Sequence, residues 1–231
     1  MDGNGRWAEG QGLIRLEGHR RGSDSVREVV TAAREIGVEA LTLYAFSAQN
    51  WARPTEEVAG LMALLYDYLD RDKPTMLRNG IRLNAIGEIQ RLPDFVRERL
   101  AAVRHETSSG KDMVLTLALS YGGKEEIITA VRRVAHDVVA GLDPSKIDEA
   151  YFDSKLDTAG LPAVDLMIRT SGELRISNFL LWQLAYAELL FVDVPWPDFG
   201  RRALFDAVET YRRRQRRFGK TGTQLAHDTD T

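Results

Sequence analysis

The sequence predicts an α/β fold consisting of a single domain, in which a central and mostly parallel sheet is flanked by helices. Strand-like apolar segments alternate with helical patterns along the chain, which is typical of parallel strands joined by crossover helices. The chain has 231 residues and is 44% hydrophobic, which is enough for a substantial core. Because no repeat, low-complexity linker or domain boundary interrupts the alternation, we expect one domain.

The first predicted helix follows a glycine-rich opening segment, residues 1–22. Apolar side chains recur at helical spacing over residues 26–36, with Ser23 or Asp24 available as the N-cap and Gly37 as the stop. These signals predict a helix that begins after the opening segment.

The first predicted strand spans residues 38–46, which are mostly apolar, and it ends in the polar residues 47–53. Because the carboxyl ends of parallel strands share one edge of a sheet, Asn50, Gly122 and Arg169 are expected on one rim. The other predicted elements are helices from about residue 54, at 93–107, at 124–139 and at about 201–218, and strands at 81–86, 113–119 and 164–168.

The composition excludes several classes of function. The net charge of −3 gives no overall argument for nucleic acid or for an anionic membrane surface, so anion binding must come from local clusters. The absence of cysteine excludes disulfides and thiolate metal sites, and it agrees with the cytoplasmic location that we expect. No apolar segment is long enough for stable membrane insertion, and no signal peptide is recognisable. The polar residues 220–231 are expected to be a disordered tail.

The opening segment carries the residue types of an anion site. A glycine turn offers consecutive backbone amides to phosphate oxygens, and the flanking cations add charge-assisted donors. A solvated glycine-rich loop is the alternative, whereas a P-loop is excluded because the Gly-Lys-Ser/Thr ending is absent. The residues that would contact phosphate are Gly3, Asn4, Gly5, Arg6, Arg15 and His19.

Asp2 indicates that a cation belongs to this site. A carboxylate repels a polyphosphate, but Mg²⁺ commonly joins one or two carboxylates to phosphate oxygens. The segment therefore predicts a Mg²⁺-diphosphate site.

Two later segments offer further phosphate donors. In residues 47–53, Ser47 and Asn50 provide neutral hydrogen bonds and Arg53 a guanidinium fork, although an ordinary turn would look similar. Arg169 and Arg175 lie around a Ser-Gly turn with Ser177, which suits a second diphosphate. Solvated surface arginines are the alternative for this pair.

These segments also resemble a known family. The stretch MDGNGRWA followed by Arg15 and GHRRG, the stretch FSAQNWARP, and the stretch RTSGELRISNF resemble the signatures of the cis-prenyltransferases, the undecaprenyl diphosphate synthase family. The resemblance covers residues 1–219, which we expect to be the catalytic domain. It departs at Gln49, where the family usually has Glu, and at the start, where an apolar family strand precedes the glycine turn but this sequence begins at Met1. If that strand is absent, the sheet has one strand fewer and Asp2 lacks the anchor that the strand gives in the family.

The resemblance implies a reaction without a covalent nucleophile. Isopentenyl diphosphate would condense with an allylic diphosphate such as farnesyl diphosphate, with Mg²⁺ as cofactor, to give undecaprenyl or a related polyprenyl diphosphate for cell-wall lipid carrier synthesis. A short-chain cis-prenyltransferase and a non-catalytic partner subunit are the alternatives, and the retained motif residues argue against the second.

The resemblance also implies roles for single residues. Asp2 and Asn50 are the expected catalytic residues, and Asp2 with Glu188 the expected metal ligands. The family's Asn is often described as the proton acceptor, but an amide is a very weak base, so we expect Asn50 to position substrate while a diphosphate oxygen takes the proton. The other expected substrate contacts are Gly3, Asn4, Gly5, Arg6, Trp7, Arg15, His19, Ser47, Ala48, Gln49, Trp51, Arg53, Arg169, Arg175, Ile176, Ser177, Arg217 and Gly219.

A homodimer and a hydrophobic tunnel are implied as well. Arg217 and Gly219 resemble the Arg-x-Gly motif that reaches across the family's dimer interface, although an arginine that ends a basic helix needs no function. The arginine-rich run at residues 212–217 is a candidate nucleic-acid surface, but it lacks interleaved aromatics and we expect no such partner. The growing chain needs an apolar lining, for which ordinary core packing is the alternative; the candidates are Met62, Leu65, Leu83, Met113, Leu115 and Leu117.

Overall fold

Three parallel strands form the centre of the fold. In the computed structural model, which describes residues 1–214, they lie in the order β1 (Ala40–Ser47), β3 (Met113–Tyr121) and β2 (Ile81–Ile86). Leu43 of β1 pairs with Leu117 of β3, and Leu83 of β2 pairs with Leu115 of β3. Every residue of β3 except Val114 is buried, as expected for a central parallel strand that is covered on both faces.

A second, two-stranded parallel sheet contains β4 (Leu166–Arg169) and β5 (Glu188–Phe191). Within the described residues, the backbone hydrogen bonds do not join this sheet to the first one. The predicted parallel α/β fold is therefore confirmed, but its strands divide into two sheets.

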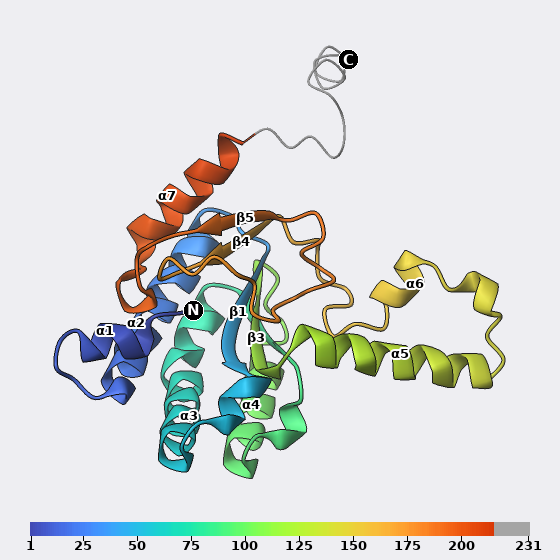
Figure 1. Cartoon of the computed structure of the whole chain (residues 1–231), viewed down its shortest axis with the longest axis horizontal. Coiled ribbons are helices and arrows are strands. Elements are labelled where there is room, and N and C mark those ends of the chain that lie inside the picture. The colour runs from blue at the N-terminus through green and yellow to red at the C-terminus, as the bar shows by residue number, and fades with distance from the viewer. Residues whose placement is uncertain (215–231) are drawn as a thin grey trace.

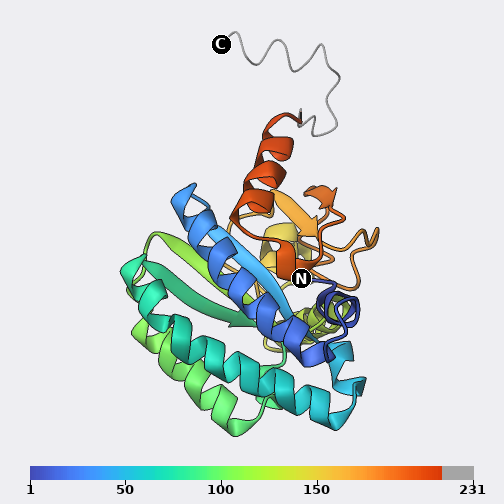
Figure 2. The ribbon, with the colours of Figure 1, turned by 90° about the vertical axis from the view of Figure 1, so that its left-hand side faces the viewer.

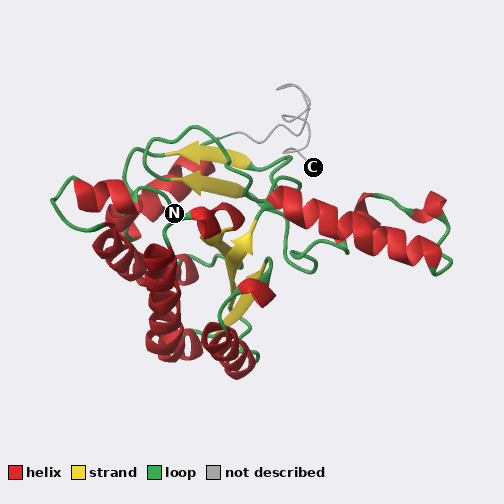
Figure 3. Ribbon diagram, turned by 60° about the horizontal axis from the view of Figure 1, so that its bottom comes forward, coloured by secondary structure: helices red, strands yellow, loops and turns green. Residues whose placement is uncertain are grey.

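Helices surround these strands. α2 to α4 lie side by side over one face of the central sheet, with α3 packed between α2 and α4 (Figures 1 and 2). Figure 3 shows α5 and α6 projecting on the opposite side of the fold from α1 and α2. The helices are α1 (Asn4–Glu9), α2 (Arg15–Glu35), α3 (Thr55–Arg78), α4 (Asp94–Glu106), α5 (Gly123–Val139), α6 (Glu149–Asp153) and α7 (Arg201–Arg212), with short 3-10 helices η1 (Ala48–Ala52), η2 (Ile89–Arg91), η3 (Pro144–Lys146) and η4 (Trp196–Asp198).

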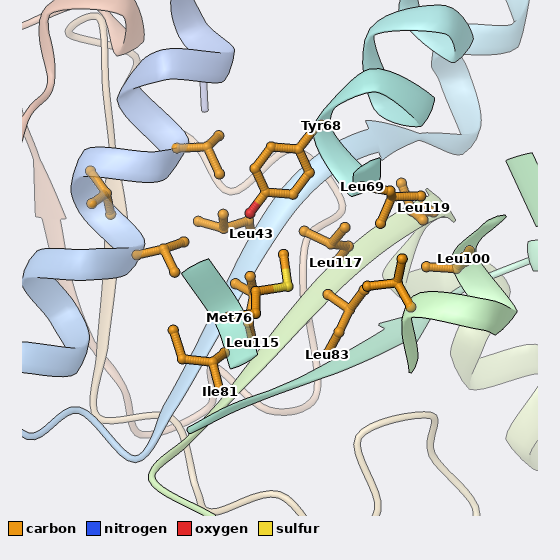
Figure 4. Close-up of a cluster of buried hydrophobic side chains, with 14 of the residues drawn as sticks. Leu43, Tyr68, Leu69, Met76, Ile81, Leu83, Leu100, Leu115, Leu117 and Leu119 are labelled. Carbon is orange, nitrogen blue, oxygen red and sulfur yellow. The ribbon is translucent and has the colours of Figure 1, made fainter. Parts of the chain in front are cut away.

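The main core fills the space between the central sheet and α2 to α4. Side chains from β3 and β2 meet Tyr68 and Leu69 of α3 there, and each of these residues is almost inaccessible to solvent (Figure 4). A smaller cluster around Tyr121 and Leu180 lies between β3 and the second sheet. No helix of residues 1–214 is long and apolar enough to cross a membrane.

The first helix predicted from the sequence corresponds to α2, and its predicted start is wrong. α2 begins at Arg15, before the expected caps at Ser23 and Asp24. The glycines that suggested a loop serve helix packing instead, because a Cβ atom at Gly18 would lie 1.9 Å from the backbone oxygen of Asn4 in α1. A Cβ atom at Gly22 would lie 2.2 Å from Asn4 Oδ1.

The other predicted elements differ from the observed ones mainly at their ends. The strand at 81–86 is confirmed, and β1 and β3 each extend to the residues that follow their predicted ends. β5 was not predicted, because four residues are too few for a periodic pattern. The last helix was expected to reach residue 218, but α7 ends at Arg212, and residues 215–231, with the expected tail, lie outside the described part of the chain.

Candidate active site

The loop that carries Asp2 is held by segments far away in the sequence. The Thr170 hydroxyl lies 2.8 Å from the Asp2 amide nitrogen and 2.9 Å from the Asp2 carbonyl oxygen. The same carbonyl oxygen accepts hydrogen bonds from Ser171 Oγ at 3.2 Å and from the Trp196 amide at 2.9 Å. The position of Asp2 is therefore set by the loop after β4 and by η4, so these two segments anchor Asp2.

The Asp2 carboxylate is ionised at neutral pH. Oδ1 accepts from the Gly3 amide at 2.7 Å, and Oδ2 accepts from Arg169 Nη2 at 2.9 Å. Burial raises the pKa of Asp2, but the hydrogen bonds from Arg169 and Gly3 and the charges of Arg169 and Arg6 outweigh it, so the net shift is downward. The side chain keeps 36% of its surface exposed, so a ligand can reach its oxygens.

Two glycines make this loop possible. Gly3 has φ of +96°, and a Cβ atom there would lie 1.9 Å from Ser171 Oγ. Gly5 lies against the Arg15 guanidinium, whose carbon would be 2.6 Å from a Cβ at that position. The absence of side chains therefore lets one arginine lie directly on the first turn of α1, where the backbone amides of a helix have no partner within the helix.

The loop after β4 joins the Asp2 loop through charged side chains. Arg169 Nη1 donates to Ser177 Oγ at 2.8 Å and also to the backbone oxygen of Arg175, while Nη2 holds Asp2. Glu173 bridges the two segments from the other side, since it pairs with Arg6 at 2.9 Å and with Arg175. The structure thus brings together the two groups of phosphate-binding residues that the sequence predicted separately.

A second basic group surrounds Glu57 in the first turn of α3. Arg53 Nη1 lies 3.0 Å and Arg15 Nε 3.7 Å from its carboxylate oxygens. His19 of α2 lies beside this group, and its Nε2 is buried without a hydrogen-bond partner. Burial, together with the charges of Arg53 and Arg15, lowers the pKa of His19 to about 4 against the opposing effect of Glu57. His19 is therefore neutral at physiological pH and is suited to hydrogen bonding rather than to ion pairing.

Ser47 and Asn50 form a local cap at the end of β1. Asn50 Oδ1 accepts the Ser47 amide at 3.0 Å, which occupies one of the two lone pairs of this oxygen. The NH₂ group of Asn50 can donate to a ligand, which favours Asn50 as a positioning donor over a proton acceptor. The adjacent Gln49 is exposed and reaches Glu125 in α5.

Several expected contact residues have structural partners. The Trp7 indole donates to Asp198 at 2.9 Å, and the Trp51 indole donates to Ser120 at 2.9 Å. Ile176 packs against the smaller core cluster, and Ala48 begins η1.

Glu188 lies apart from Asp2. Glu188 pairs with Leu166 at the start of β4, whereas Arg169 and the Asp2 contact are at the other end of that strand. Its carboxylate is 2.8 Å from Arg214.

Arg217 and Gly219 lie outside the described residues. Sequence reasoning missed Thr170, Glu57, Glu173, Glu125 and Asn178, of which Thr170, Glu173 and Asn178 lie inside the recognised stretch RTSGELRISNF.

The comparisons with known proteins identify the family of this chain. The family model described as undecaprenyl diphosphate synthase matches residues 1–219. An isoprenyl transferase from Chlorobaculum tepidum is 49% identical over 97% of this chain and 85% of its own length. A ditrans,polycis-undecaprenyl-diphosphate synthase from Aliivibrio fischeri, specific for (2E,6E)-farnesyl diphosphate, is 49% identical over 97% of this chain and 88% of its own length.

Solved structures show the same fold. Lavandulyl diphosphate synthase from Lavandula x intermedia, in complex with dimethylallyl diphosphate, superposes with a TM-score of 0.93 at 37% identity, covering 95% of both chains. A probable undecaprenyl diphosphate synthase from Campylobacter jejuni gives a TM-score of 0.77 at 35% identity, covering 87% of this chain and 93% of its own. With its motif residues gathered around Asp2 and Arg169, the chain belongs to the undecaprenyl diphosphate synthase family of prenyltransferases.

Proposed function

We propose that this protein condenses isopentenyl diphosphate with an allylic diphosphate such as farnesyl diphosphate. The product is undecaprenyl diphosphate or a related cis-polyprenyl diphosphate that serves cell-wall lipid carrier synthesis. The observation that carries the proposal is the position of Arg169, which binds Asp2 at 2.9 Å and Ser177 at 2.8 Å and so joins two phosphate-binding loops. The names of the Aliivibrio and Chlorobaculum relatives support it.

Each loop takes one diphosphate. The first turn of α1, with Arg15 and neutral His19, holds the allylic diphosphate, and Arg169, Arg175 and Ser177 hold isopentenyl diphosphate. The allylic C–O bond breaks, the double bond of isopentenyl diphosphate forms the new C–C bond, and a proton leaves to a diphosphate oxygen. The cationic donors stabilise the negative charge that develops on the departing diphosphate.

The residues around Asp2 fit Mg²⁺. The carboxylate is ionised and partly exposed, and a carboxylate with substrate phosphates is the donor set that Mg²⁺ favours. When bound, the ion supplies positive charge to the leaving diphosphate. Within residues 1–214 no three acidic or histidine side chains gather around a common point, so Asp2 and the substrate would provide the ligands within one chain.

Release of inorganic diphosphate tests the proposed reaction. Each condensation frees one diphosphate, so release should require both substrates and Mg²⁺. Release from the allylic substrate alone at the same rate would show hydrolysis instead of condensation. No release under any condition would favour the non-catalytic partner subunit.

Replacing Arg175 with alanine should raise the KM for isopentenyl diphosphate by about tenfold with a smaller change in kcat, because a phosphate clamp acts in the ground state as well as in the transition state. Steady-state kinetics with each substrate varied in turn measure this. Arg202→Ala is a matched control, since the Arg202 side chain is 96% exposed on α7. An unchanged KM for isopentenyl diphosphate would remove Arg175 from the site.

The growing chain needs an apolar space, which we place between the central sheet and α3. The candidate residues Met62, Leu83, Leu115 and Leu117 are all buried there in the main core (Figure 4 shows three of them). Of two surface cavities of about 470 and 430 Å³, one lies beside β2 and α4 and has Leu83 among its lining residues, and the other lies on α5.

Met113 marks the far end of this space. It begins β3, eight residues before Tyr121 at the rim, which corresponds to roughly 26 Å along a strand. Met113→Ala should therefore lengthen the product, and thin-layer sizing of labelled products measures this. Leu204→Ala, a buried change on α7, controls for general loosening of the core. Identical product distributions in Met113→Ala and wild type would place the end of the tunnel elsewhere.

A short-chain product is the second candidate. The lavender enzyme, with a TM-score of 0.93, is named for a short-chain product and holds dimethylallyl diphosphate. Product sizing separates the two candidates directly. Nucleic-acid binding gains no support, because Arg213 and Arg214 of the basic run pair with Glu209 and Glu188 of the same chain.

We also propose a homodimer in which each C-terminal segment completes the neighbouring site. Leu174 and Tyr186 expose 77% and 82% of their surfaces, and Ile128 and Val131 form an exposed apolar pair on α5. Such surfaces are typical of protein interfaces.

Mixed dimers test this arrangement. Arg217→Ala and Asp2→Ala homodimers should both be inactive, but subunit exchange should restore one working site per heterodimer, because an intact Asp2 then meets an intact Arg217. Diphosphate release after verified exchange is the measurement. A mixture that stays inactive would mean that Arg217 acts within its own subunit.

A further inference from the structure

Glu125 connects α5 to two other segments at the rim of the central sheet. It lies in the first turn of α5, directly after β3. Its Oε1 accepts a hydrogen bond from Gln49 Nε2 of η1 at 3.4 Å, and its Oε2 accepts one from Asn178 Nδ2 at 2.8 Å. Each carboxylate oxygen therefore holds the amide of a different loop.

The loop that contains Asn178 has an unusual backbone. Ser177, Asn178 and Leu180 have φ of 52°, 62° and 44°, in the left-handed region that residues with a Cβ atom rarely adopt. Such a conformation persists only where the surrounding contacts determine it. Here it places Ser177 Oγ 2.8 Å from Arg169.

The contacts that determine this turn come from α5. Asn178 Oδ1 accepts the Lys124 amide at 2.8 Å, and the Asn178 carbonyl oxygen accepts the Gly123 amide at 2.7 Å. The bond from Asn178 Nδ2 to Glu125 is the third. Gly122 leaves room for it, because a Cβ atom there would lie 2.2 Å from Glu125 Oε2 and 2.6 Å from Asn178 Nδ2.

Gln49 matters because its side chain is uncharged. In this chain a Glu side chain in the same place would set its carboxylate against that of Glu125, and two close carboxylates repel each other. The amide NH₂ of Gln49 instead donates to Glu125 and leaves its other oxygen for Asn178.

We propose that Glu125 is a positioning residue for the isopentenyl diphosphate site and that Gln49 is the neutral partner that Glu125 requires. The pair then holds the turn that presents Ser177 to Arg169. This proposal rests on the proposed function, in which Ser177 contacts isopentenyl diphosphate.

A double-mutant cycle tests the coupling. Gln49→Glu should raise the KM for isopentenyl diphosphate by about tenfold, with a much smaller change in kcat and in the KM of the allylic substrate. Glu125→Gln should change this KM by no more than about threefold, since the new amide can still accept from Asn178. Combining the two changes should return the KM to within about threefold of wild type, because the amide at position 125 can also donate to the carboxylate at position 49.

The alternative explanation is that a carboxylate at position 49 repels the substrate directly, and it predicts a different result for the double variant. It would leave the double variant as impaired as Gln49→Glu, and this outcome, or a Gln49→Glu variant with an unchanged KM, would overturn the proposal. Asn178→Ala is the second variant, and it should raise the same KM even if Gln49→Glu folds poorly. An unchanged KM in Asn178→Ala would also overturn the proposal.

Calorimetric titration with isopentenyl diphosphate alone separates this proposal from the proposed function. The dissociation constants of the four proteins in the cycle should follow the same pattern as the KM values. If the wild type turns over but the cycle shows no coupling between positions 49 and 125, only the role of Glu125 and Gln49 is overturned. A wild type that neither binds isopentenyl diphosphate nor turns over overturns both proposals.

Discussion

Replacing Asp2 with alanine is expected to lower kcat by about 10³-fold or more, the scale on which loss of electrostatic stabilisation of a leaving group acts. The carboxylate is ionised, partly exposed and held between Arg169 and the Gly3 amide, which suits the proposed role of holding Mg²⁺ against the allylic diphosphate. The fold should remain, because Thr170 and Trp196 hold the backbone of residue 2 and do not hold its side chain. Diphosphate release and thermal unfolding measure the two effects.

Two further variants sharpen this result. Asp2→Asn keeps the size of the side chain and removes its charge, so it should be nearly as inactive as Asp2→Ala. Asp206→Ala removes an exposed carboxylate of α7 and should leave activity unchanged. Full activity in Asp2→Ala would end the proposal that Asp2 holds the metal.

Replacing Arg169 with alanine is expected to lower kcat/KM for isopentenyl diphosphate by about 10²-fold to 10³-fold. The guanidinium is only 12% exposed and contacts Asp2, Ser177 and the Arg175 backbone, so its loss disturbs both phosphate-binding loops. Arg169→Lys should retain more activity than Arg169→Ala but less than wild type, because an ammonium keeps the charge without the fork of donors.

The pH dependence of Arg169→Ala provides a second readout. The hydrogen bond and charge of Arg169 lower the pKa of Asp2, so their removal raises it. Since only the ionised carboxylate can hold Mg²⁺, the acidic limb of the kcat/KM profile should move to higher pH in the variant. An acidic limb at the wild-type position would show that Asp2 and Arg169 do not interact in the working enzyme.

The strands and the long helices could be predicted because their signals are local. Alternating apolar segments located β1, β2, β3 and β4 within a few residues. The same reasoning did not predict that α2 begins at Arg15, because Gly18 and Gly22 are typical of loops. In the structure these glycines let Asn4 of α1 pack against α2. It also failed for β5, whose four residues are defined by pairing with β4.

The candidate site was predictable in its residue types but not in its connections. Sequence motifs named Asp2 and Arg169 separately, but only the fold joins them across 167 residues. Glu57 could not be inferred, since a carboxylate between arginines has no sequence pattern of its own. Glu173 lies inside the RTSGELRISNF stretch, but its ion pair with Arg6 is visible only in the fold. Glu188 was predicted as a metal ligand from family resemblance, and the parallel register of β4 and β5 places it at the opposite end of the strands from Arg169 within one chain.

The size of the labelled product tests the central claim most directly. The purified protein is incubated with Mg²⁺, farnesyl diphosphate and radiolabelled isopentenyl diphosphate, and the extracted products are dephosphorylated and sized by chromatography. The two joined phosphate-binding loops predict a series of lengthening polyprenyl products that ends near the undecaprenyl length and disappears when EDTA removes the metal. Label that stays in unreacted isopentenyl diphosphate, or a product series that is unaffected by EDTA, would contradict this account.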